Sequence, residues 1–116
     1  MIRITHFAAF VLAAVMALVV MPVLADEAHL HIDHWPQTRT GQSMVALAPL
    51  RDTVSRYDAR PGSKIVIRYP GGDLGSDWAA ELRDWLVALG VPSSDLVVEP
   101  ASGLPDTMVL QVMDGR

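Results

Sequence analysis

Cysteine is missing from the 116-residue sequence. Its absence excludes disulfide bonds, a thiol nucleophile, thiolate metal sites and the lipidated cysteine of a bacterial lipoprotein. Any folded part of the chain must therefore take its stability from a hydrophobic core rather than from covalent cross-links.

Basic residues are also scarce. Nine Lys and Arg stand against thirteen Asp and Glu, which gives a formal net charge of −4. Binding to phosphate groups requires clustered positive side chains, and no such cluster is visible in the sequence. Nucleic acids and anionic membrane surfaces are therefore not expected as partners.

The N-terminal segment has the pattern of an export signal. Arg3 precedes an uncharged apolar stretch at residues 7–20, and small or branched residues continue to Ala25. This stretch is shorter than the roughly 20 residues that cross a membrane. We expect a secretory signal peptide over residues 1–25, with an uncleaved membrane anchor as the alternative. Cleavage would release residues 26–116, with a net charge of −5 and no membrane span, as one periplasmic or secreted domain.

Four segments of the remaining chain predict β-strands. Alternation with a period of two, or a run of β-branched residues, marks each of them. They are residues 29–35, 64–69, 96–99 and 107–113. The first strand would place Leu30 and Ile32 on one face, and the β-branched run at 65–67 is typical of an interior strand.

Two segments have the 3.6-residue apolar period of helices. The first lies between Met44 and Tyr57, and we expect it to begin at about Ala48 because Pro49 is tolerated in a first turn. The second follows the glycine-rich segment 70–75, begins at Ser76 or Asp77 and ends at Leu89. The order β-α-β-α-β-β predicts an α+β fold, a two-layer sandwich with two helices on one face of a four-stranded sheet.

The segment from Lys64 to Gly103 resembles the peptidoglycan-associating domain at the C-terminus of OmpA and related envelope proteins. The similarity is carried by the element order and by residues 85–92, WLVALGVP, which lead from a helix through a Leu-Gly-Val-Pro turn into the Val-rich strand 96–99. In that family an aspartate after the second strand and an arginine at the start of the following helix hold the diaminopimelate group of the peptidoglycan stem. The resemblance therefore implies the same fold and a place in the cell envelope.

The ligand residues of that family are only partly present here. Asp73 could stand for the aspartate, but the place of the arginine falls on Trp78, and an indole cannot form charge-assisted hydrogen bonds to a carboxylate. Arg83, five residues further along, and Arg68, in the strand, would each require a rearranged site. The resemblance thus implies a degenerate site at Asp73 and Arg83. The alternatives are that Asp73 stabilises its own turn and that Trp78 belongs to the core.

A second candidate site is the H-x-H-x-x-H cluster of His29, His31 and His34. In a strand, His29 and His31 share a face, so their imidazoles could meet one Zn²⁺ or Cu²⁺ ion. The alternative is a solvent-facing strand with incidental histidines.

Motifs of catalysis are not visible in the sequence. It contains neither a Gly-x-Ser-x-Gly elbow nor a His-Glu-x-x-His helix, and the glycine-rich segment 70–75 lacks the lysine of a phosphate loop. We therefore expect a small exported domain without enzymatic activity or cofactor, which binds peptidoglycan or an envelope protein. A periplasmic Zn/Cu-binding protein is the second hypothesis.

Overall fold

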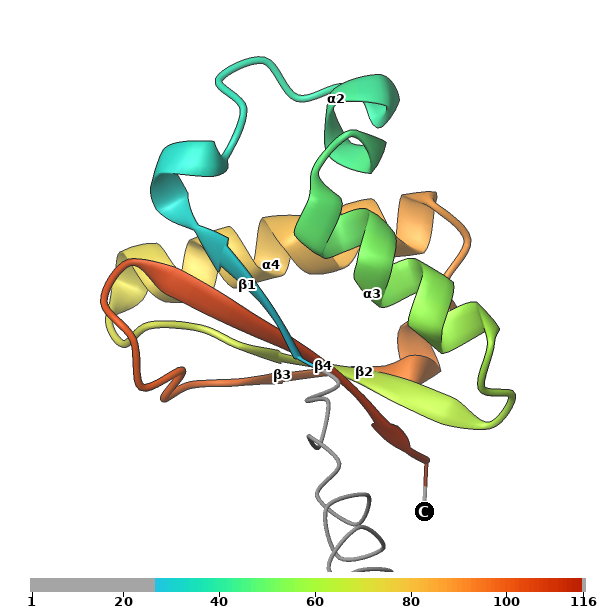
Figure 1. Cartoon of the computed structure of the whole chain (residues 1–116). Coiled ribbons are helices and arrows are strands. Elements are labelled where there is room, and N and C mark those ends of the chain that lie inside the picture. The colour runs from blue at the N-terminus through green and yellow to red at the C-terminus, as the bar shows by residue number, and fades with distance from the viewer. Residues whose placement is uncertain (1–26, 116) are drawn as a thin grey trace, which may run out of the picture.

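The computed structural model describes residues 27–115. They form one four-stranded sheet with helices on one of its faces (Figure 1). The strands are β1 (Glu27–His31), β2 (Ser63–Arg68), β3 (Leu96–Glu99) and β4 (Thr107–Asp114). The α-helices are α2 (Gly41–Val45), α3 (Ala48–Asp58) and α4 (Asp73–Ala88), and the 3₁₀ turns are η1 (Ile32–His34) and η2 (Ser93–Asp95). The predicted signal peptide, residues 1–25, lies outside the described residues.

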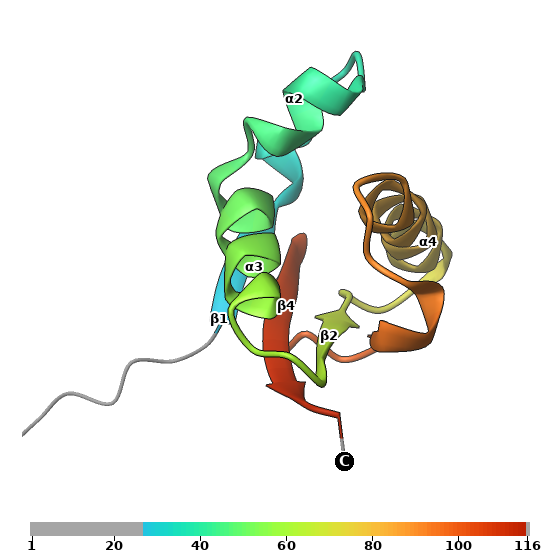
Figure 2. The same ribbon diagram turned by 90° about the vertical axis from the view of Figure 1, so that its right-hand side faces the viewer.

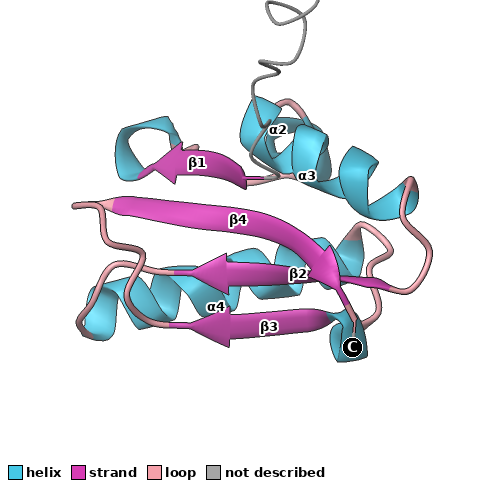
Figure 3. Ribbon diagram, turned by 60° about the horizontal axis from the view of Figure 1, so that its bottom comes forward, coloured by secondary structure: helices cyan, strands magenta, loops and turns pink. Residues whose placement is uncertain are grey.

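The sheet is mixed, with the strand order β1-β4-β2-β3 (Figure 3). Strand β4 is antiparallel to both of its neighbours, whereas β2 and β3 run parallel. The crossover that parallel neighbours require is supplied by α4. The two interior strands are therefore β4 and β2, and the edges are β1 and β3.

The two long helices cover the same face of the sheet, as the end-on view shows (Figure 2). Their apolar sides and the inward side chains of the strands form one core. Its fully buried members include Leu50 from α3, Leu82 and Leu86 from α4, and Ile65 and Leu110 from the sheet. These observations confirm the predicted α+β class and two-layer arrangement. The structure adds the short helix α2, which precedes α3 and buries Met44.

Helix α3 begins where the sequence predicted. It runs from Ala48 and has Pro49 in its first turn. An N–H at this position would have no partner inside the helix, so the proline removes no helical hydrogen bond. The interior position of the second strand is also confirmed, because Ile65, Val66 and Ile67 are all buried.

The first strand is shorter than predicted. It ends at His31, which pairs with Thr107, the first residue of β4, so no partner strand continues beyond that point. The chain then turns, because the N–H of Trp35 donates to the carbonyl of Ile32 at 3.0 Å. The prediction that Ile32 lies in the strand on the same face as Leu30 is therefore wrong: Leu30 is fully buried on β1, whereas Ile32 lies in η1 and is 39% exposed.

Helix α4 begins one turn earlier than predicted. Its N-cap is Gly72, whose φ of 95° lies in a region that glycine adopts without strain. The N–H of Ser76 already donates to the carbonyl of Gly72 at 3.1 Å, so Asp73, Leu74 and Gly75 belong to the first turn. The predicted start at Ser76 or Asp77 is therefore wrong, because both residues lie inside the helix and its cap is Gly72.

Candidate functional site

A groove of about 390 Å³ lies where β2 ends, η1 follows β1 and β4 begins. Three chain segments supply its walls: η1, the segment from β2 into α4, and the loop before β4. The lining residues are Ile32, Pro70, Gly71, Leu74, Gly75, Trp78 and Asp106. Ligands commonly bind at such a position, where loops from several elements converge beside the end of a sheet.

The glycines give this groove its shape. A Cβ atom on Gly75 would lie 2.0 Å from the carbonyl oxygen of Pro70, so only glycine lets the first turn of α4 pack this closely on the loop. Gly72 reverses the chain between the loop and the helix with its positive φ. The glycine-rich segment thus places helix and loop backbone together on one wall.

The opposite wall is held by a backbone hydrogen bond. The N–H of Ile32 donates to the carbonyl of Asp106 at 2.8 Å, which joins the end of β1 to the loop before β4. Asp106 has a φ of 48°, the left-handed conformation that Asp and Asn adopt more readily than most residues. Its exposed carboxylate is the only charged side chain among the lining residues.

Trp78 forms the aromatic part of the groove. It is 8% exposed, and its indole N–H is buried without a hydrogen-bond partner within the described residues. An unpaired buried donor costs about 1–3 kcal/mol. The sequence suggested a core role for Trp78, and the structure confirms this burial while also placing the ring at the groove.

Two of the three tryptophans of the chain pack together at the groove, and the third is connected to them through an ion pair. We define the tryptophan cluster as Trp35, Trp78 and Trp85 together with Arg39 and Glu81. The rings of Trp35 and Trp78 pack edge to face, with centroids 5.9 Å apart, and the Arg39 guanidinium lies 5.8 Å from the Trp35 centroid. Such aromatic and cation–π contacts each contribute about 0.5–1.5 kcal/mol.

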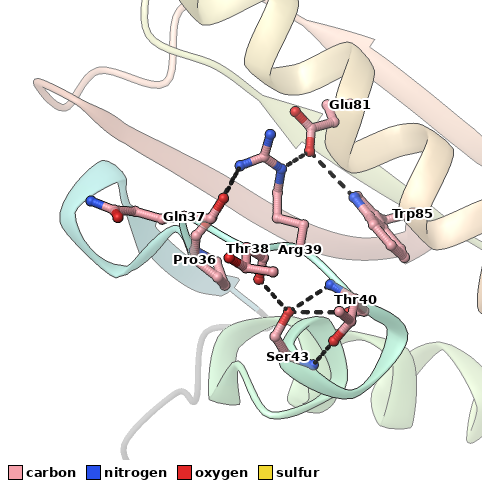
Figure 4. A network of polar contacts seen from close by, with 8 residues as sticks. All are labelled: Pro36, Gln37, Thr38, Arg39, Thr40, Ser43, Glu81 and Trp85. Carbon is pink, nitrogen blue, oxygen red and sulfur yellow. Dashed lines mark hydrogen bonds and ion pairs between the residues drawn. The ribbon is translucent and has the colours of Figure 1, made fainter.

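Glu81 joins the two sides of this cluster (Figure 4). Its carboxylate pairs with Arg39 from the segment before α2 and accepts a hydrogen bond of 3.3 Å from the Trp85 indole on α4. Arg39 also donates to the carbonyl of Pro36 at 3.0 Å. The segment between η1 and α2 is thereby fixed against α4, behind the Trp78 wall of the groove.

The two ligand residues implied by the resemblance are not brought together. Asp73 is exposed in the first turn of α4, next to the groove-lining residues Gly71 and Leu74. Arg83 follows ten residues later on the same helix, which corresponds to an axial rise of about 15 Å. The guanidinium Nη1 of Arg83 lies 3.7 Å from Oδ1 of Asp84, and Arg83 does not line the groove. The structure therefore does not place Asp73 and Arg83 side by side at the groove.

The three histidines lie on two elements, and only two of their rings are in contact. His29 is on β1 with its Nε2 3.6 Å from Glu27, whereas His31 ends the strand and His34 lies in η1. The rings of His31 and His34 are 6.4 Å apart. Within residues 27–115 there is no group of three or more His, Cys, Asp or Glu residues placed to hold a metal ion. The described part of the chain therefore does not bring His29, His31 and His34 together as a three-residue ligand set.

A depression of similar volume, about 420 Å³, lies at the other end of β2. It is lined by Pro61, Gly62, Asp114 and Gly115, without an aromatic side chain or an unpaired buried donor. The groove at Trp78 is therefore the stronger candidate for ligand binding, because it combines an aromatic ring and aliphatic side chains with an exposed carboxylate.

The partners of Trp78 were not predicted from the sequence. The contacts of Trp35 with Trp78 and of Arg39 with Glu81 join residues that are distant in the chain and carry no motif, and Ile32 was predicted to lie in a strand. The only available signal for Asp106 was its place in the Gly-Leu-Pro-Asp segment before a strand, which is typical of a turn.

Comparison with protein-family models, with curated proteins and with solved structures finds no match to this chain. Among the described residues, no helix has the length and apolar character needed to span a membrane.

Proposed function

We propose that this protein is a small exported binding domain of the bacterial cell envelope, without enzymatic activity, and that the groove at Trp78 is its binding site. The observation that carries the proposal is the groove itself. It lies beside the turn in which the OmpA-like resemblance places the ligand aspartate, and it combines a carboxylate with an apolar wall.

The element order supports the OmpA-like part of the proposal. Residues 27–115 follow the β-α-β-α-β-β order that the resemblance implies, with both long helices on one face of the sheet. The peptidoglycan site is proposed to be degenerate, because Trp78 occupies the place of the family's arginine and Arg83 lies far from Asp73. A short carboxylate-bearing ligand therefore lacks its cationic partner in this groove.

Two measurements test this function. N-terminal sequencing of protein from a periplasmic extract is expected to find a chain that begins at Asp26. A chain that keeps residues 1–25 and stays in the cytoplasm would contradict export.

Co-sedimentation with isolated peptidoglycan sacculi tests the state of the site. The purified protein is compared with Asp73→Ala and with Asp52→Ala, a matched change at an exposed carboxylate on α3. A degenerate site predicts little pelleting, and equal pelleting of the two variants. Strong pelleting that only Asp73→Ala abolishes would show that peptidoglycan binding survives, and the proposed degeneracy would be wrong.

A further inference from the structure

The groove combines negative charge with apolar surface and has no basic lining residue. Asp106 supplies a carboxylate from the loop before β4. Leu74 and Ile32 are both exposed apolar side chains, at 86% and 39%, and they belong to different walls. A partner that fits this surface presents a cation next to aliphatic groups.

Two of the elements that form the groove, η1 and α4, also carry carboxylates outside its lining. Asp33 lies in η1 with a side chain 83% exposed, and Asp73 and Asp77 lie in the first two turns of α4. The N-terminus of α4 opposes them with the equivalent of about half a positive charge. Asp73, in that same turn, offsets this dipole, so the Asp106 carboxylate is the charge that the lining presents to a ligand.

We propose that the groove binds a basic linear segment of another protein, with a Lys or Arg side chain at Asp106 and a neighbouring aliphatic side chain against Leu74 and Ile32. This inference rests on the proposed function and names the class of its partner.

A protein segment fits this groove better than a peptidoglycan stem. The diaminopimelate group carries carboxylates beside its amine, and these would meet Asp106 and Asp73 without a basic lining residue to balance them. A lysine or arginine side chain in a protein presents the cation without a carboxylate.

The test uses three capped, fluorescein-labelled peptides that differ at one position: Ala-Leu-Lys-Leu-Ala, the norleucine analogue and the glutamate analogue. Binding to the purified protein is measured by fluorescence polarisation at low salt, because surface charge pairs are screened at high salt. We expect the lysine peptide to bind at least about threefold more tightly than the norleucine peptide, and the glutamate peptide most weakly.

Two variants locate the effect. Asp106→Asn removes the charge and retains a side chain that tolerates the positive φ, so the loop is expected to keep its shape. It should abolish the preference for lysine over norleucine, whereas Asp52→Asn on α3 should preserve it. Leu74→Ser is expected to weaken both peptides equally, without loss of stability, because Leu74 is already solvent-exposed.

Equal binding of the lysine and norleucine peptides, or a preference that survives in Asp106→Asn, would overturn the inference. The inference would also be overturned if none of the three peptides bound. The proposed function fails separately, through retention in the cytoplasm or through Asp73-dependent pelleting with sacculi. If pelleting depended on Asp73 and the three peptides bound equally, peptidoglycan would be identified as the ligand instead.

Discussion

Replacing Gly75 by alanine is expected to destabilise the protein, although the same change usually stabilises a helix. A helical Gly→Ala substitution ordinarily gains up to about 1 kcal/mol. At Gly75, however, the new Cβ would lie 2.0 Å from the Pro70 carbonyl oxygen, where ordinary contact begins at 3.4 Å. Helix α4 and the loop would have to separate by about 1.4 Å, because backbone cannot rotate away as a flexible side chain can.

Forced overpacking of this kind costs about 1–3 kcal/mol. When the full helix-propensity gain is subtracted, we expect a net loss of up to about 2 kcal/mol in the free energy of unfolding. For a domain of this size, that loss corresponds to a fall in Tm of up to roughly 15 °C. The displaced helix start would also deform the groove, so binding should weaken in the same variant.

Gly41→Ala is the matched control. Gly41 also lies in the first turn of a helix, but a Cβ there meets nothing within 4 Å. We expect it to leave the free energy of unfolding unchanged or to raise it by up to about 1 kcal/mol. Urea unfolding followed by tryptophan fluorescence measures both variants. If Gly75→Ala were as stable as the wild type, the close approach that shapes the groove would be refuted.

Three further predictions concern the rest of the fold. Leu82→Ala should lower the free energy of unfolding by about 2–5 kcal/mol because Leu82 is fully buried. Trp85→Ala should lower it less, because Trp85 is only partly buried. Equal losses of stability for the two variants in urea unfolding would contradict this order. Thr40→Ala should cost about 1 kcal/mol because Thr40 forms a capping box with Ser43, whereas Thr38→Ala, whose side chain makes no cap, should cost little in the same assay. The hydrogen bond that Tyr57 donates to the Asp95 carboxylate, followed by burial, raises the pKa of Tyr57 above its ordinary value of 10.0. The folded state then holds this proton more tightly than the unfolded state, so the stabilisation is complete below about pH 10 and is lost as the pH rises through the folded pKa. Urea midpoints from pH 8.5 to 11 should therefore fall less in Tyr57→Phe than in the wild type, and parallel curves would contradict the assignment.

The predictions from sequence succeeded where periodicity and local chemistry act together. The β-branched run at 65–67 identified an interior strand, and the place of Pro49 identified the start of α3. Both depend on neighbours in the sequence, so no knowledge of distant contacts was needed.

The predictions failed where a distant partner decides the structure. The first strand ends at His31 because its partner β4 begins at Thr107, more than 70 residues away. The alternation of apolar and polar residues continues to Trp35, but no strand is there to pair with it. The early start of α4 depends on the approach of Gly75 to Pro70, which the pattern of apolar residues does not encode.

The candidate site was predicted only in part. Asp73 and Trp78 were singled out, and both lie at or beside the groove. Asp106, Ile32 and the Arg39–Glu81 pair were not, since each enters through tertiary contacts between segments without a motif.

A binding site in the groove can be located by mapping chemical-shift changes in the ¹⁵N-labelled protein on titration with the lysine peptide. A binding site in the groove predicts the largest changes at the Trp78 indole N–H and at the backbone amides of Gly71, Gly75 and Asp106. Changes confined to α3, β3 or the helix-free face of the sheet would contradict the claim.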